Sequence, residues 1–445
     1  MYNTIAIESY VIPSVAIINA AFMKDTKSAA SGRGMPGVRY VTHTIPPECT
    51  VKQDIESGVE EIIDEVVAAL TKPLSEEEEF SKKKTEKTRR IIFKGDLEGV
   101  NRFYYEKGWA DGLPIVPPTE EFVSEMLQGT DLPPDHVVAK IIPRLGKATI
   151  EKIAINAVMA GCLPTHIPVL IAGVKAIMDL ETSGFGVIEV STGSWTPCWI
   201  INGPIRKDIN INYKTGAFSP GDLANAAIGR AMGLIIQNIG GARKGIEDMG
   251  TLGNPMKHSM VIGEDEEGSP WDPLHVERGF RKEDSAVTVF FPNTYIQIWP
   301  YGTNAKGVLQ ATVYNIPPAR TGTFCLLLNE GHAKSLAREG WTKKEIKDFI
   351  VEFARCPGYK HFYKYWSRQK ELIPPTDMDQ VSLFETPDHI IVMVGGGVGN
   401  WMGLILGSRP QITEGVFVTK KVKLPKNWQE LVTKYRNVVP KYSFY

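Results

Sequence analysis

The stretch TIEKIAINAVMAGCLPTHIPVLIAGVKAIMD, residues 149–179, decides how the long part of this chain is layered. Its two apolar segments, 149–160 and 164–179, have helical patterns and are separated by a short break. Further helical patterns occupy 223–239 and 342–354. Strand-like runs alternate with these helices at 198–202, 287–291, 295–299, 323–329 and 389–394. The alternation predicts an α/β architecture, mixed α+β in this long segment, with several layers around a β-rich centre.

The first 72 residues predict a separate small α/β unit. A β-rich run at 4–8, an apolar helical stretch at 10–23, a strand at 39–45 and an amphipathic helix at 51–70 give the order βαβα. Two strands and two helices cannot cover both faces of a parallel sheet. We therefore expect this unit to extend a larger sheet, in its own chain or, as we favour, in a partner's.

A charged segment, 73–92, divides the small unit from the rest. It contains SEEEEFSKKKTEKTRR at 75–90, which is typical of a solvated linker or a charged helix, although its blocks of opposite sign also suit a subunit contact. After it, 93–445 shows no second linker and is predicted to be one large α/β catalytic or binding domain.

Composition excludes several classes of function. The 445 residues carry a net charge of -1, which gives no reason to expect a nucleic acid or an anionic membrane as partner. No long uncharged apolar run occurs, and the start MYNTIAIESY lacks the basic region of a signal peptide. The five cysteines are scattered, so neither a disulfide framework nor a four-cysteine zinc site is expected. We expect a cytoplasmic protein that acts on a small molecule.

Cys162 is the first candidate for chemistry, in the turn AGCLPTH at 160–166. A thiol just ahead of a helix N-terminus meets unpaired backbone N–H groups and the positive end of the helix dipole, which favour the thiolate. Cys162 is therefore a candidate nucleophile or proton relay. The alternative is a buried cysteine in a small-residue turn that lets two helices pack closely.

The acidic stretch EDEEGSPW at 264–271 is the second candidate. It follows a β-rich run, and His275 lies nearby, so these groups could bind a divalent cation or act as acid and base. The alternative is a structural charge network, since no recognised metal-ligand spacing occurs. The predicted roles are metal ligation for Glu264 and Asp265, catalysis for Glu266 and His275, and substrate contact for Trp271.

Arginines that follow tight turns form the third candidate. A guanidinium fork suits the capture of a carboxylate or phosphate, whereas the simpler reading is helix capping and surface ion pairs. The residues predicted to bind substrate here are Asn202, Arg206, Arg230 and Arg243.

Two further stretches follow apolar strands, where ligands of α/β sheets bind. His332 in NEGH is a candidate for proton transfer or a plain helix cap, and Gly397 in GGGVGN belongs to an anion-binding or close-packing loop. Neither G-x-G-x-x-G nor the P-loop pattern fits, so there is no nucleotide fingerprint. The cofactor stays unassigned, with a divalent metal as the one candidate.

The chain resembles the UGSC family of thiol or selenol proteins, named for a selenocysteine-or-cysteine, Gly, Ser, Cys motif. The resemblance extends through both parts of the chain. It rests on GMPGVRYVTHTI (34–45), GWADGLPIVPPTEE (108–121), INAVMAGCLP (155–164), INGPIR (201–206), ANAAIGRAMGLIIQNIGGAR (224–243) and SPWDPLHVERGF (269–280). The motif itself is absent, and we expect residue 1 to lie downstream of where it would fall.

The resemblance implies thiol- or selenol-dependent chemistry, with the reactive group supplied by a small subunit that carries the redox motif. The alternative is that the motif was lost and the site of the long segment works without it. The expected partner is such a small subunit or a further copy of the chain in a homo-oligomer. The leading hypothesis is the large subunit of such an enzyme complex, an oxidoreductase or lyase. It would act reductively or by elimination on a carbon–heteroatom bond of a small carboxylate-bearing molecule. The alternatives are a metal-dependent lyase or hydratase that uses the 264–267 acids, and a non-catalytic scaffold subunit.

Overall fold

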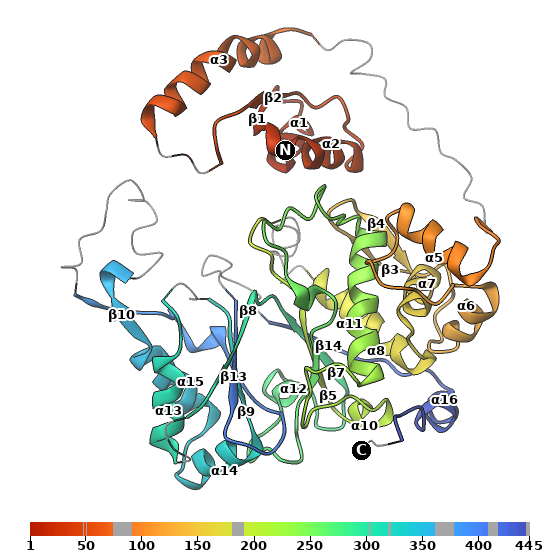
Figure 1. Ribbon diagram of the computed structural model, residues 1–445, viewed down its shortest axis with the longest axis vertical. Coiled ribbons are helices and arrows are strands. Elements are labelled where there is room, and N and C mark those ends of the chain that lie inside the picture. Colours follow the sequence, from red (N-terminus) through yellow and green to blue (C-terminus); the bar gives the residue numbers. More distant parts are fainter. Residues whose placement is uncertain are drawn as a thin grey trace.

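The chain after residue 90 folds into four layers, helices–sheet–sheet–helices, in the computed structural model (Figure 1). The first sheet has the order β14(Val418–Lys421)-β7(Ala286–Phe290)-β5(Cys198–Asn202)-β6(Val261–Gly263). The second has the order β12(Ile390–Val394)-β9(Phe324–Leu328)-β13(Met402–Leu406)-β8(Thr294–Ile298). The structure describes residues 1–47, 49, 51–73, 91–179, 191–300, 302, 304–318, 322–360, 378–407 and 417–441.

Both sheets have the same pattern of strand directions. In each, one edge pair is parallel, β5 with β6 and β9 with β12, and the remaining pairs are antiparallel. The parallel pairs bring their carboxyl ends to one edge of each sheet. The backbone N–H of Asp265, just after β6, donates to Val394 O of β12 over 2.8 Å, so the two sheets are joined at this edge.

The inner strands are buried on both faces, which explains their continuous apolar sequences. In β9, Phe324, Leu326 and Leu328 pack into the core shared with the outer helices. The alternate residues Cys325 and Leu327 pack into the core between the sheets. This separation follows from the two-residue side-chain period of a strand.

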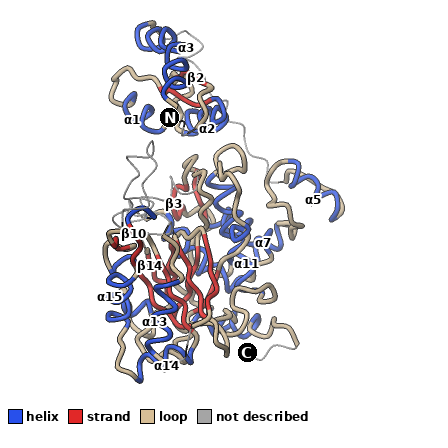
Figure 2. Tube along the Cα trace, turned by 60° about the vertical axis from the view of Figure 1, so that its left-hand side comes forward, coloured by secondary structure: helices blue, strands red, loops and turns tan. Residues whose placement is uncertain are grey.

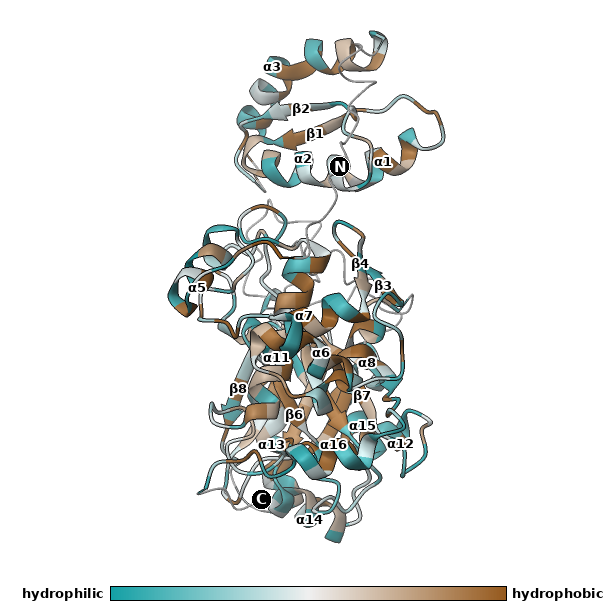
Figure 3. Ribbon diagram, turned by 90° about the vertical axis from the view of Figure 1, so that its right-hand side faces the viewer, coloured by the Kyte–Doolittle hydropathy of each residue, from teal (hydrophilic) through white to brown (hydrophobic). Residues whose placement is uncertain are grey.

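Helices cover the two outer faces, as the tube view shows (Figure 2). On the first sheet lie α7(Ile150–Ala160), α8(Ile167–Ile177) and α11(Leu223–Ile235), and on the second lie α13(Ala305–Tyr314), α14(Glu330–Arg338) and α15(Lys343–Phe353). The apolar colouring is concentrated on α7, α8 and α11, whereas α15 shows more polar surface (Figure 3). The predicted mixed α/β architecture is confirmed.

Peripheral elements complete the large segment. A hairpin joins β3 and β4, and a short antiparallel pair joins β10 and β11. Their bounds, with those of the remaining helices, are α5(Leu97–Glu106), α6(Glu120–Leu127), β3(Val137–Ile141), β4(Gly146–Thr149), α10(Ile205–Asp208), α12(Leu274–Glu277), β10(Arg355–Pro357), β11(Gln380–Ser382) and α16(Trp428–Tyr435).

The small unit contains α1(Tyr2–Glu8), β1(Ala16–Asn19), α2(Met23–Gly32), β2(Tyr40–His43) and α3(Lys52–Thr71), with β1 and β2 parallel. The βαβα order is present, but its beginning differs from the prediction. The expected strand at 4–8 is helix α1, and the expected helix at 10–23 holds strand β1. Pro13 interrupts that stretch, and a short apolar run does not distinguish strand from helix by periodicity alone.

The charged stretch at 75–90 lies outside the described residues, so its predicted role as a linker stays a prediction. Within the described parts of the chain, no helix combines the length and the apolar character needed to cross a membrane.

Candidate functional site

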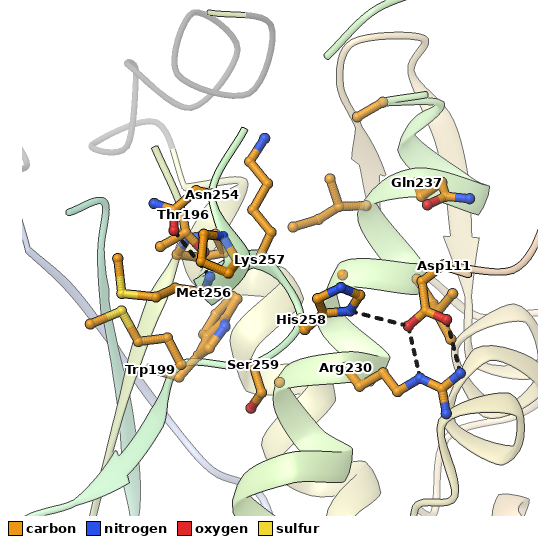
Figure 4. A pocket seen from close by; sticks show the side chains of 18 of the residues that line it. Asp111, Thr196, Trp199, Arg230, Gln237, Asn254, Met256, Lys257, His258 and Ser259 are labelled. Atoms are coloured by element: carbon orange, nitrogen blue, oxygen red, sulfur yellow. Dashed lines mark hydrogen bonds and ion pairs between the residues drawn. The ribbon is translucent and has the colours of Figure 1, made fainter. Parts of the chain in front are cut away.

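A cavity of about 200 Å³ lies under α11, at the amino-terminal ends of β5 and β6 (Figure 4). We call it the α11 cavity. Its volume is below the roughly 300–1,000 Å³ of drug-sized sites, so it suits a smaller molecule. The lining residues used below are Asp111, Thr196, Trp199, Arg230, Lys257 and His258.

An ion pair forms one wall of the α11 cavity. Arg230 on α11 donates from Nε to Asp111 Oδ2 over 2.8 Å and from Nη2 to Asp111 Oδ1 over 2.9 Å. Burial favours the neutral carboxyl, but the hydrogen bonds and charge of Arg230 outweigh it and lower the pKa of Asp111. Arg230 was predicted to bind a substrate carboxylate, but in the structure it is already paired with the carboxylate of Asp111. Its Nη1 takes part in neither of these two bonds.

The same helix holds the loop that carries Asp111. Arg230 Nη2 also donates to the carbonyls of Leu113 and Pro114. A π-helical turn, Ile236–Gly240, continues α11, and within it Gln237 donates to Gly108 O over 2.9 Å. Such π turns often occur at functional sites. The Gly- and Pro-rich passage at 108–118 is thus fixed along α11, and its Asp111 lines the cavity.

His258 faces this ion pair. Its Nδ1 lies 3.9 Å from Asp111 Oδ2, and its side chain is 56% exposed, so solvent or a ligand can reach it. Beside it, Lys257 is paired with Asp248 over 2.6 Å. A histidine that lies near a carboxylate and is open to a cavity can transfer protons. Sequence reasoning missed His258, since its only signal is a histidine just before a buried strand.

The opposite wall contains Trp199 and Thr196, with Asn254 and Lys257 beside them (Figure 4). Trp199 on β5 is 2% exposed, and Thr196 just before this strand is 1% exposed. Thr196 Oγ1 has no hydrogen-bond partner in the described part of the chain. Next to it, Ser194 has a left-handed backbone, φ 58°, which is a strained conformation for a residue other than glycine.

The predicted acidic site lies elsewhere, at the carboxyl ends of the parallel strands. There Asn202 donates from Nδ2 to Glu264 Oε2 over 2.7 Å and to Glu266 Oε1 over 3.1 Å. Arg206, 2% exposed, pairs with Glu266 Oε2 over 3.0 Å and with Glu267 Oε1 over 3.1 Å. Burial opposes ionisation of Glu267, yet Arg206 and Lys207 lower its pKa to about 2.

These contacts form a buried structural network. Glu264 also accepts from the backbone N–H of Leu274 over 2.7 Å and lies 3.4 Å from Lys343 Nζ. Among the described residues, no group of three or more His, Cys, Asp and Glu side chains is arranged to hold a metal ion. Glu264, Asp265, Glu266 and His275 therefore do not form the predicted metal site, because protein donors already occupy the oxygens of Glu264 and Glu266.

Other predicted residues near this edge lie in packed surroundings. His275 is fully buried, and its Nδ1 lies 4.0 Å from Glu266 Oε1. Trp271 Nε1 donates to Trp341 O over 3.0 Å. A Cβ on Gly397 would come within 1.9 Å of Thr215 Oγ1, so this glycine serves close packing. His332 is 2% exposed, and burial lowers its pKa.

Cys162 lies in the core between α7 and α11, not in a cavity with the other candidates. Its Sγ donates to Ala227 O over 3.3 Å, and burial raises its pKa well above the usual range. His166 is also buried, which lowers its pKa to about 3. The prediction that the surroundings of Cys162 favour the thiolate is wrong, because loss of water outweighs the helix dipole. Burial likewise raises the pKa of Cys198, Cys325 and Cys356.

Arg243 marks the contact between the small unit and the large segment. It donates from Nη2 to Glu247 Oε1 over 2.6 Å, and Glu247 accepts from Ser28 on α2. Asp25, one turn earlier on α2, interacts electrostatically with Glu247. Burial, then the charge of Glu247, raise the pKa of Asp25 to about 6. Arg243 is thus an interface residue, and the next residue after Glu247, Asp248, lines the α11 cavity.

Comparison with known proteins identifies a relationship for the small unit and for no other part of the chain. The sequence model of the UGSC family matches residues 1–72, which confirms the resemblance for this part of the chain. For the residues after 72 the resemblance stays a prediction. No curated protein and no solved structure shows significant similarity to the chain.

The buried network predicts a large effect of Lys343→Met. Burial favours a neutral Lys343, but Glu264 and Glu277 outweigh it and raise its pKa. Removal of the ammonium leaves Glu264 buried without its counter-charge, at a cost of about 3–5 kcal/mol in the free energy of unfolding. Urea unfolding measures it, and the double variant Lys343→Met with Glu264→Gln should recover much of the loss.

The exposed neighbour Lys344 gives the matched control, because its pair with Asp348 lies in solvent. Lys344→Met should change the unfolding free energy by no more than about 0.5 kcal/mol. Equal effects of the two lysine substitutions would contradict a buried network.

The contact at Glu247 predicts a pH-dependent stability. Asp25 binds its proton more tightly in the folded than in the unfolded chain, because its folded pKa is raised from 3.8 to about 6. Its stabilising contribution is therefore complete below pH 3.8 and is lost as the pH rises through 6. Asp25→Asn should raise Tm at pH 7.5 relative to the unaltered chain, and the difference should shrink toward pH 4.

Thermal unfolding across this pH range makes the measurement, with Asp64→Asn on the exposed face of α3 as the control. A Tm difference between Asp25→Asn and the unaltered chain that does not vary with pH would show that this contact does not titrate.

Proposed function

We propose that this chain is the larger, substrate-binding subunit of a thiol- or selenol-dependent enzyme. The substrate is a small carboxylate-bearing molecule that binds in the α11 cavity, and the reaction cleaves or forms a carbon–heteroatom bond by reduction or elimination. This makes the chain a part of an oxidoreductase or a lyase.

The single observation that carries the proposal is the placement of His258 against the Asp111–Arg230 pair in a cavity. Asp111 Oδ2 lies 3.9 Å from the imidazole, and the exposed ring can give a proton to a departing heteroatom. Arg230 Nη1 and Lys257 provide positive charge for a carboxylate. The paired acids Asp111 and Asp248 keep the cavity close to neutral when it is empty.

The reactive sulfur or selenium is proposed to come from a partner. The four cysteines of the large segment are poor candidates, because burial raises their pKa and disfavours the thiolate. The fifth, Cys49, lies in the small unit just before α3. The match of this unit to the UGSC family supports a partner with the redox motif, and the contact at Glu247 brings the unit next to Asp248 of the cavity.

His258→Asn tests the role of the cavity. Loss of a general acid should lower kcat of the assembled enzyme by about 100-fold or more, with a smaller change in KM. His136→Asn is the matched control, since His136 is exposed and lies outside the cavity. If the His258→Asn variant turns over substrate at the unchanged rate, the proposal of catalysis by this chain is contradicted, and the scaffold hypothesis is supported instead.

Alkylation locates the sulfur. Treatment of the isolated chain with iodoacetamide, followed by removal of the reagent and assembly with the untreated partner, should leave turnover unchanged. Treatment of the partner alone should abolish it. If alkylation of this chain stops turnover and Cys49→Ser prevents that loss, the reactive thiol belongs to the small unit of this chain.

A further inference from the structure

The wall of the α11 cavity opposite His258 contains a buried hydroxyl that has no hydrogen-bond partner among the described residues. Thr196 is 1% exposed, and its Oγ1 finds no hydrogen-bond partner in the described residues. Its backbone N–H donates to Pro292 O over 2.9 Å, so the residue is fixed in place. A buried hydroxyl without a partner costs free energy, which a bound polar group at this position would recover.

Neighbouring polar side chains do not have this property. Asn254 donates to Ser194 O over 3.1 Å and accepts from the backbone N–H of Met256 over 3.0 Å. Ser259 donates to Asn225 O over 2.7 Å. Thr196 therefore differs from these two residues in having a hydroxyl without a hydrogen-bond partner among the described residues.

Between Thr196 and His258 the cavity is lined by apolar side chains together with Asn254 and Lys257. Trp199 lies along this part of the cavity, and Met256 is beside it (Figure 4). Leu234 and Met260 also line the cavity and are buried. A flat apolar body fits such a lining, since indole and thioether groups pack well against rings. The two polar ends, Thr196 on one side and His258 with Arg230 on the other, lie apart.

We infer that the α11 cavity selects an amphipathic carboxylic acid with a hydrogen-bonding group at its far end. The carboxylate lies toward His258 and Arg230, the apolar body lies along Trp199, and the far group bonds to Thr196 Oγ1. This inference rests on the proposed function, because it takes the α11 cavity as the substrate site. It adds the specificity: Thr196 distinguishes substrates with a polar far end from substrates without one.

Two probes that differ by one hydroxyl test the inference, 3-(4-hydroxyphenyl)propanoate and 3-phenylpropanoate. Titration calorimetry with the full chain should show roughly 3- to 10-fold tighter binding of the hydroxylated probe, the value of one neutral hydrogen bond. Thr196→Val keeps the shape and removes the hydroxyl, so it should abolish this preference and leave 3-phenylpropanoate binding unchanged. Thr196→Ser should retain the preference.

Thr251→Val is the matched control, because Thr251 is exposed and outside the cavity. Equal binding of both probes to the unaltered chain overturns the inference, as does weakening of both probes alike by Thr196→Val. Absence of binding of either probe up to about 10 mM also overturns it. These outcomes are separate from failure of the proposed function, which unchanged turnover of His258→Asn would show.

Discussion

The bidentate ion pair between Arg230 and Asp111 is the interaction on which the candidate site depends. It joins α11 to the loop at 108–115, which contributes Asp111 to the lining of the cavity. The same carboxylate is 3.9 Å from His258, so this pair both borders the cavity and lies beside its histidine. Structure and chemistry of the α11 cavity are therefore coupled through a single contact.

The opposite ends of the strands show what happens when charges are fully paired. Asn202, Arg206 and Glu264 are buried, and they bond to one another or to backbone groups. Such a network holds the carboxyl ends of the parallel strands in place, and protein donors already bond to the carboxylates of Glu264 and Glu266. The acidic cluster at 264–267, which the sequence marks as a candidate for catalysis or metal binding, thus forms a structural network. The α11 cavity carries less charge, and its His258 is accessible.

The layers of this fold could be predicted because each inner strand is buried on both faces, and β5 was expected at 198–202 where the structure has it. The short strand β1 was missed because its pairing with Tyr40–His43, not its local pattern, determines its conformation. The site was harder to predict. Arg230 and Asp111 are 119 residues apart, and nothing in either stretch indicates that they meet. Cys162 had a plausible local signal, which burial by α11 reverses.

The central claim is that ligands bind under α11 and not at the carboxyl ends of the strands. A crystal structure of the full chain grown with 3-phenylpropanoate tests it most directly. We expect the carboxylate beside His258 and the ring along Trp199. A ligand bound between Glu264 and Gly397, with the space under α11 unchanged, would contradict the account.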